Sequence, residues 1–140
     1  MRYWDASVLV CLCVEESDSV TARRLATGGI ATWSVSAVEI ASAIERRSRE
    51  GSLDAAGRAA ARTALNELTA AWIEITALAA VRERALRLVA THGLRAADAM
   101  QLGAALVAVS DRPQGHEFVC ADVRLRDAAS REGFHVLPAR

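Results

Sequence analysis

The 140-residue chain contains no lysine, so arginine supplies all 17 of its basic side chains. Acidic residues also number 17, and the resulting net charge of zero argues against binding nucleic acid through bulk positive charge. Arginine suits bidentate contacts with phosphate. However, an alanine- and arginine-rich chain without lysine is also typical of a GC-rich genome. Because the arginines are spread along the whole chain, we give that compositional explanation most of the weight.

Long apolar runs are absent as well. The run from Ala6 to Val14 is too short to span a bilayer and is interrupted by Ser7. No positively charged leader with a small-residue cleavage site precedes it, so we expect a cytoplasmic protein without a membrane anchor. The length and the 52% hydrophobic content fit one globular domain spanning residues 1–140.

Cysteine and histidine are too few and too scattered to form a zinc site. The cysteines are Cys11, Cys13 and Cys120, and the histidines are His92, His116 and His135. None of these residues belongs to a Cys or His pair at ligand spacing. We therefore expect buried, reduced thiols and histidines with surface or packing roles.

Apolar periodicity and turn residues divide the chain into alternating strands and helices. Strands are expected at residues 2–4, 30–33, 72–76, 117–120 and 135–137. Helices are expected at residues 7–14, 19–26, 36–49, 54–68, 78–91, 95–109 and 123–132. This interleaving indicates an α/β fold with a parallel sheet that is covered by helices on both faces.

Each of the three tryptophans, Trp4, Trp33 and Trp72, falls in an expected strand. An aromatic platform for stacking RNA bases is one interpretation. Burial is favoured, because the strands of a covered sheet lie in the core. In the helix at residues 36–49, Val38, Ile40, Ala41 and Ile44 are expected to face mostly inward.

Four carboxylates follow a strand or open a helix in this pattern: Asp5, Glu39, Asp98 and Asp122. In an open α/β sheet such positions converge in the crevice beyond the carboxyl ends of the strands. Four acids in one crevice would repel one another unless a positive charge bound between them. A hard divalent cation prefers oxygen ligands. The pattern therefore suggests a metal-dependent enzyme that acts on phosphate esters.

Each acid also has a purely structural explanation. Asp5 and Asp122 stand where a side chain caps a helix. Ser36 and Glu39 have the spacing of a capping box. Asp98 lies in the first turn of its helix, where the dipole favours a negative charge, and Arg95 is a local partner for it. These alternatives stay open for each acid taken singly, and only their convergence favours a site.

Four segments carry a resemblance to a known family: Tyr3-Trp4-Asp5-Ala6-Ser7, Trp33 to Glu39, Leu94 to Ala99 and Phe118 to Leu125. They resemble the acidic motifs of the PIN-domain ribonucleases, and among these the VapC-type toxins of toxin–antitoxin pairs. The resemblance covers nearly the whole chain and keeps the order of the motifs. The chain departs from the family at Cys120, where Ser or Thr is common. A thiol is a poor hydrogen-bonding substitute for a hydroxyl.

The resemblance implies a PIN-like three-layer sandwich, with a parallel sheet of about five strands in the order 3-2-1-4-5. It also implies Mg²⁺- or Mn²⁺-dependent cleavage of single-stranded RNA, homodimerisation and inhibition by a cognate antitoxin. Asp5, Glu39 and Asp98 would hold the cation directly or through waters. Asp122 would complete the site or hold a second cation. Ser7 would orient Asp5 or a metal-bound water.

Five arginines gather on two consecutive expected helices: Arg46, Arg47, Arg49, Arg58 and Arg62. The resemblance suggests that these helices project beside the active site, where the arginines would contact RNA phosphates or the antitoxin. A solvated face that Glu45 and Glu50 balance explains the same arginines equally well.

The missing lysine bears on a competing class of phosphoacceptor domains. Response-regulator receivers and haloacid-dehalogenase-like phosphatases also place an aspartate after the first strand. Both rely on a lysine near the phosphoryl group, and this chain has none. The phosphatases also need Asp-x-Asp, where this chain has Asp5-Ala6-Ser7. The remaining alternative to catalysis is a PIN-like module that only binds RNA or a protein.

Overall fold

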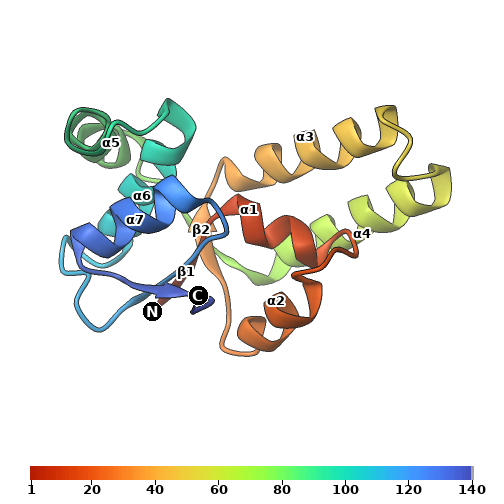
Figure 1. Ribbon diagram of the computed structural model, residues 1–140, viewed down its shortest axis with the longest axis horizontal. Coiled ribbons are helices and arrows are strands. Elements are labelled where there is room, and N and C mark those ends of the chain that lie inside the picture. The colour runs from red at the N-terminus through yellow and green to blue at the C-terminus, as the bar shows by residue number, and fades with distance from the viewer. Residues whose placement is uncertain (140) are drawn as a thin grey trace.

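A computed structural model describes residues 1–139 of the chain (Figure 1). Its five short strands form one parallel sheet in the order β3-β2-β1-β4-β5. The strands are β1 (Arg2–Trp4), β2 (Ala31–Trp33), β3 (Ile73–Ile75), β4 (Glu117–Val119) and β5 (His135–Leu137). The α/β class and the strand order expected from the sequence are therefore confirmed.

Seven α-helices connect and cover these strands within the described residues. They are α1 (Ala6–Leu9), α2 (Ser19–Ala26), α3 (Ser36–Arg49), α4 (Ala55–Ala71), α5 (Leu78–His92), α6 (Ala96–Ala108) and α7 (Val123–Glu132). In Figure 1, α1 to α4 lie on one side of the sheet, and α5 to α7 lie on the other. No helix within residues 1–139 combines the length and the apolar character needed to cross a membrane.

Successive strand residues feed two separate cores, because neighbouring side chains of a strand point to opposite faces of a sheet. Tyr3 and Phe118 stack with ring centroids 5.3 Å apart, and they pack with residues of α5, α6 and α7. Trp4 and Val119 pack on the other face with residues of α1 to α4. The central strands of the sheet are thereby buried on both faces, which keeps their carboxyl ends in fixed positions.

Helix α6 lies unusually close to α5 at Gly103. A Cβ built on Gly103 would meet the carbonyl oxygen of Val81 at 2.8 Å, a contact that would push the two helices apart. Buried alanines around this glycine, among them Ala99 and Ala105, complete the close contact. The small residues of α6 thus hold the helix against its neighbours and determine where its first turn lies.

Some expected boundaries and facings differ in the structure. The helix expected at residues 7–14 is divided into α1 and a tighter 3₁₀ turn, Val10–Leu12. Alanine-rich α4 continues to Ala71, so Trp72 ends that helix instead of joining β3, although it is buried as expected. Val38 is 66% exposed, because the buried stripe of α3 runs through Ile40 and Ile44, one turn apart.

Candidate active site

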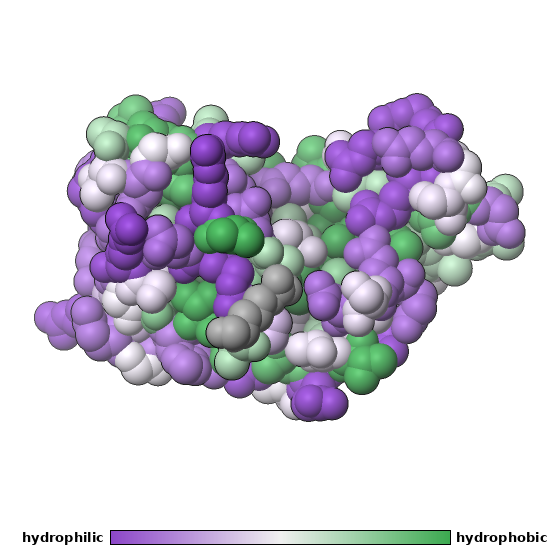
Figure 2. All heavy atoms as spheres, in the orientation of Figure 1, coloured by the Kyte–Doolittle hydropathy of each residue, from purple (hydrophilic) through white to green (hydrophobic). Residues whose placement is uncertain are grey.

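The four carboxylates singled out in the sequence line one pocket of about 350 Å³. Asp5 directly follows β1, and Asp122 lies just beyond β4, the strand that pairs with β1 where the order of the sheet reverses. Glu39 and Asp98 lie in the first turns of α3 and α6. Open α/β sheets bind ligands in the crevice at this switch point. Figure 2 shows the molecule hollowed between its two halves, with hydrophilic side chains on both sides.

Asp5 is the most deeply buried of the four, with 4% of its surface exposed. Its Oδ2 accepts a hydrogen bond from the Ser7 backbone N–H at 3.2 Å, so Asp5 does cap α1 as the structural alternative requires. This cap leaves the charge of the carboxylate without a counter-charge. Burial raises the pKa of Asp5, although its hydrogen bonds with Ser7 and Cys120 pull the pKa back down. Capping and ion binding are therefore compatible at this position.

Glu39 does not form the capping box that its spacing suggested, so that interpretation is wrong. Helix α3 begins after Val35 without a side-chain cap, and the Ser36 hydroxyl is buried among other partners. Glu39 Oε1 instead accepts a hydrogen bond from Gln101 Nε2 at 3.3 Å. Burial, followed by the charge of Asp5, raises the pKa of Glu39 to about 7.

The remaining two acids, Asp98 and Asp122, differ in their burial and in their bonding partners. Asp98 is half-buried, and burial and the charges of Asp5 and Asp122 raise its pKa, which Arg95 only partly offsets. Within residues 1–139, Asp98 and Arg95 form no ion pair. Asp122 is exposed and caps α7, with its Oδ1 accepting from Leu125 N–H at 2.9 Å. Asp98 therefore has a charge that Arg95 balances only in part.

Ser7 and Cys120 bracket the Asp5 carboxylate. The Ser7 hydroxyl accepts from the Ala121 backbone N–H at 3.1 Å and lies 3.8 Å from the Cys120 sulfur. The Cys120 thiol lies 3.6 Å from Asp5 Oδ2. Burial and the neighbouring Asp5 raise the pKa of this thiol, which keeps it protonated and able to donate. Position 120 thus contacts the site despite its departure from Ser or Thr.

All three cysteines are free thiols, as expected from the sequence, but Cys13 is only half-buried.

Two arginines also line the pocket, Arg46 and Arg47. Arg47 forms a 2.5 Å ion pair with Glu16, whereas Arg46 has no ion-pair partner in the described part of the chain. Of the two, Arg46 has the guanidinium that remains available for a bound phosphate.

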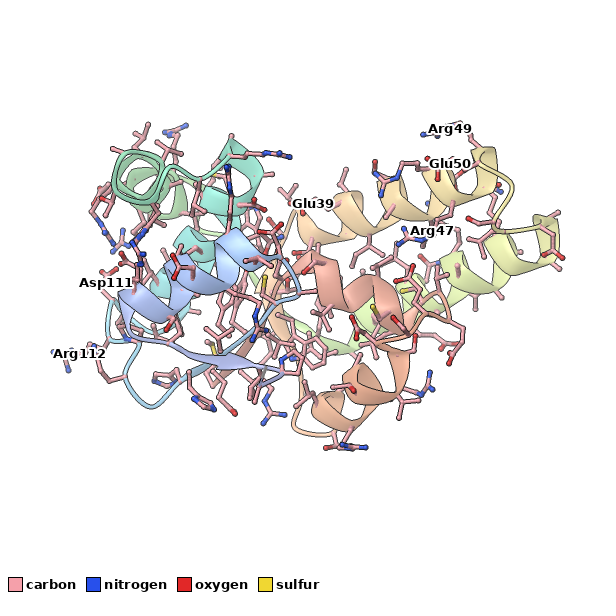
Figure 3. The ribbon with its side chains drawn as sticks, viewed as in Figure 1. Glu39, Arg47, Arg49, Glu50, Asp111 and Arg112 are labelled. Carbon is pink, nitrogen blue, oxygen red and sulfur yellow. The ribbon has the colours of Figure 1, made fainter. Side chains whose placement is uncertain are left out.

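The remaining three arginines of that group do not line the pocket. Arg58 and Arg62 bond to Glu45 at 2.8 and 3.3 Å and tie α4 to α3. Arg49 lies at the far end of α3, well away from Glu39 at its start (Figure 3). Two of the five arginines are therefore placed beside the carboxylates, and balancing by Glu45 accounts for Arg58 and Arg62.

The donor chemistry of the pocket fits a hydrated divalent cation better than a closed metal cage. Carboxylate oxygens are the ligands that Mg²⁺ and Mn²⁺ prefer. Within residues 1–139, no three Asp, Glu, His or Cys side chains lie close enough to hold one ion together. Like-charge repulsion keeps bare carboxylates apart. Because Mg²⁺ retains several of its waters, one or two direct carboxylates and further water-mediated ones satisfy it.

Gln101 is a polar contact of the site that sequence reasoning missed. It lies in α6, three residues after Asp98, and it is fully buried. One signal was present in the sequence, since Gln101 interrupts an otherwise small and apolar stretch from Ala99 to Ala105. A buried amide in such a stretch requires polar partners.

The chain matches the PIN domain family over residues 2–130, a range that contains all four carboxylates, Ser7 and Gln101. No curated protein matches the chain. PIN domains are generally nuclease domains, and they typically use divalent metal ions. With this match spanning nearly its whole length, the chain belongs to the PIN domain family.

Proposed function

We propose that this PIN-domain protein is a Mg²⁺- or Mn²⁺-dependent endoribonuclease that hydrolyses phosphodiester bonds in single-stranded regions of RNA. One observation carries the proposal: four carboxylates from distant parts of the chain line a single pocket, and burial raises the pKa of three of them. Such a pocket attracts a cation because none of the four acids forms an ion pair within residues 1–139. The family's general nuclease character agrees with this chemistry.

In this mechanism the side chains of the pocket have distinct tasks. Asp5, Glu39 and Asp98 would hold the cation directly or through waters, and Asp122 would complete the site or hold a second ion. When bound, the cation supplies charge that polarises the scissile phosphate and lowers the pKa of an attacking water. Ser7, through its backbone N–H, keeps the Asp5 carboxylate in place.

The substrate side of the proposal rests on the arginines of the pocket. Arg46 is exposed and lines the same pocket as the acids, so its guanidinium can contact a phosphate next to the scissile one. Arg47 contributes less, because Glu16 already engages its guanidinium. The preference for single strands follows from the resemblance to PIN-domain ribonucleases.

We propose further that the protein is the toxin of a toxin–antitoxin pair, acts on cytoplasmic RNA, dimerises and is inhibited by a cognate antitoxin. The resemblance to VapC-type toxins supports this role. A protein partner has an apolar surface available on α5 and α6, where a shallow pocket of about 150 Å³ is lined by Leu86, Val89 and Met100. Leu86 is 67% exposed there.

A cleavage assay with labelled single-stranded RNA tests the nuclease proposal. We expect endonucleolytic products in Mg²⁺ or Mn²⁺ and none in EDTA. The variant Asp98→Asn should be inactive, whereas Asp111→Asn, whose carboxylate bonds to Arg84 far from the pocket, should cleave normally. RNA binding without cleavage in either metal would favour a non-catalytic binding module instead.

A further inference from the structure

A network of buried hydrogen bonds lies beneath the pocket and ends at Glu39. Gln101 is its centre: Oε1 accepts from the Tyr3 hydroxyl at 2.5 Å, and Nε2 contacts Ser36 Oγ at 2.9 Å and Glu39 Oε1 at 3.3 Å. The Ser36 hydroxyl in turn lies 2.7 Å from Thr32 Oγ1. Apart from Glu39, all of these side chains are fully buried. Burying so many polar groups is costly unless each one is paired.

Backbone groups at both ends determine the direction of every bond in this network. The Trp33 backbone N–H donates to the Tyr3 hydroxyl at 3.1 Å, so the proton of Tyr3 points to Gln101. An amide oxygen accepts and an amide nitrogen donates. The Gln101 oxygen must therefore face Tyr3, and its nitrogen must face Ser36 and Glu39.

The second end gives the same answer independently. Thr32 donates its only hydroxyl proton to the Trp4 carbonyl at 2.7 Å, so in the Thr32–Ser36 contact Ser36 is the donor. With its proton used, Ser36 Oγ can only accept from Gln101. A flipped amide would aim its oxygen at the Ser36 lone pairs and at the Glu39 carboxylate. Only one amide orientation satisfies both ends.

This orientation presents two N–H groups, one to Ser36 and one to Glu39. Gln101 is the one hydrogen-bond donor to the Glu39 side chain within residues 1–139. Its bond favours the charged carboxylate, against burial and the charge of Asp5. Since the bond occupies Oε1, the second carboxylate oxygen is left for another ligand.

We propose that Gln101 is a positioning residue of the cation site: oriented by Tyr3, its amide holds Glu39 by one oxygen and leaves the other for a divalent cation. This inference rests on the proposed metal-dependent function. Residues that orient metal ligands in this way typically change metal affinity about 10- to 100-fold when they are replaced.

Mn²⁺ binding to the purified full chain, followed by the electron paramagnetic resonance signal of the free ion, tests the proposal. Gln101→Leu keeps the approximate size of the side chain but cannot donate, and it should weaken Mn²⁺ binding about 10- to 100-fold. Tyr3→Phe removes the hydroxyl that orients the amide and should weaken binding in the same direction, by less. In the cleavage assay, Gln101→Leu should need more Mg²⁺ for half-maximal rate and recover much of kcat at saturating Mg²⁺.

Thr32→Val is the matched control. It breaks two buried hydrogen bonds, to Trp4 and Ser36, at the end of the network that does not contact Glu39, and it leaves the Tyr3–Gln101 bond to orient the amide. It should lower the melting temperature without changing Mn²⁺ affinity. An equal loss of affinity in Thr32→Val and Gln101→Leu would overturn the proposal, because the effect would then follow stability.

Wild-type Mn²⁺ affinity in Gln101→Leu would also overturn it. If Gln101→Leu does not fold, Gln101→Met, an unbranched side chain that also cannot donate, decides the matter, and unchanged affinity in that variant overturns the proposal. A wild-type chain that binds no Mn²⁺ is a different result: it overturns the proposed metal-dependent function, and the role of Gln101 with it.

Discussion

The carboxylates whose pKa is clearly shifted fall into two groups that differ in what balances their charge. In the first group each acid bonds to an arginine and has a lowered pKa: Glu15, Glu45, Asp111 and Glu132. In the second group each acid lines the pocket, has a raised pKa and has no ion-pair partner within residues 1–139: Asp5, Glu39 and Asp98. The chain neutralises the first group with its own arginines, whereas the charge of the second group is what the proposed divalent cation would balance.

The same difference is seen at an arginine that lines the pocket. Arg47 lines the pocket, yet its ion pair is with Glu16 and not with any of the four carboxylates. Arginine is abundant in this chain, so the absence of such a pair in the pocket is not a matter of composition. An arginine that formed ion pairs with these carboxylates would occupy the oxygen atoms that the proposed cation would need.

The largest expected effect separates the two groups by activity. Asp5→Asn and Asp98→Asn should each lower RNA cleavage by on the order of 10³-fold or more, because a metal's stabilisation of the transition state is worth several kcal/mol. Cleavage rates at saturating Mg²⁺ measure this, with circular dichroism to show that the fold is kept. Asp111→Asn, from the arginine-bonded group, should retain the wild-type rate. Full activity in Asp98→Asn would show that the pocket carboxylates are no more important for cleavage than the arginine-bonded ones.

Removing a charge should destabilise the protein when the acid bonds to an arginine, but not when the acid lines the pocket. Glu132 is 13% exposed at its side chain and bonds to both Arg87 and His92 at 2.7 Å. Removing this charge with Glu132→Gln should destabilise the protein by about 1–3 kcal/mol, since it breaks charged hydrogen bonds in a mostly buried setting. Asp98→Asn relieves repulsion in the pocket and should leave the metal-free protein at least as stable. Urea unfolding in EDTA compares the two variants, and equal destabilisation would contradict the grouping.

The pH dependence of stability should reveal the raised pKa of Glu39. Between its ordinary pKa of 4.5 and about 7 in the folded protein, the folded state binds more protons than the unfolded state. Stability of the metal-free protein should therefore fall as pH rises through this range. We expect a loss of about 5–10 °C in the melting temperature. Glu39→Gln should reduce the loss and saturating Mg²⁺ should remove it, because Asp5 and Asp98 also have raised pKa values. An unchanged slope in Glu39→Gln would rule out this carboxyl as a source of the loss.

The smallest effect concerns the arginines. Arg46→Ala should lower RNA affinity and reduce the slope of log K against log salt by about 0.7, the value for one phosphate contact with a single strand. Arg58→Ala should change neither, because Glu45 already engages that guanidinium. Fluorescence anisotropy in EDTA at several salt concentrations measures both variants. Identical slopes for the two would show that Arg46 makes no phosphate contact.

Much of the fold and the positions of the four acids could be predicted from the sequence. Asp5 and Asp122 follow strands, and parallel strands bring such positions to one edge of a sheet. Helix starts at Ser36 and Ala96 could be recognised locally, which placed Glu39 and Asp98 at the same edge. Local patterns were sufficient here because each acid lies within a few residues of a strand end or a helix start.

Features that depend on long-range contacts could not be predicted in this way. Ser36 and Glu39 have capping-box spacing, but Thr32 and Gln101 occupy the Ser36 hydroxyl instead. The Tyr3–Gln101 bond joins residues 98 positions apart. The arginines of α3 and α4 were grouped because they are close in sequence. In the structure, Arg58 forms an ion pair with Glu45 and does not line the pocket. In each case a tertiary partner competes successfully with the local pattern.

Calorimetric titration of Mn²⁺ into the metal-free protein above pH 7 tests the central claim most directly. The account predicts saturable binding that raises the melting temperature, is retained in Asp111→Asn and is lost in Asp98→Asn. If the wild-type chain bound no Mn²⁺, or if Asp98→Asn bound it equally well, the claim that the pocket carboxylates bind a divalent cation would be contradicted.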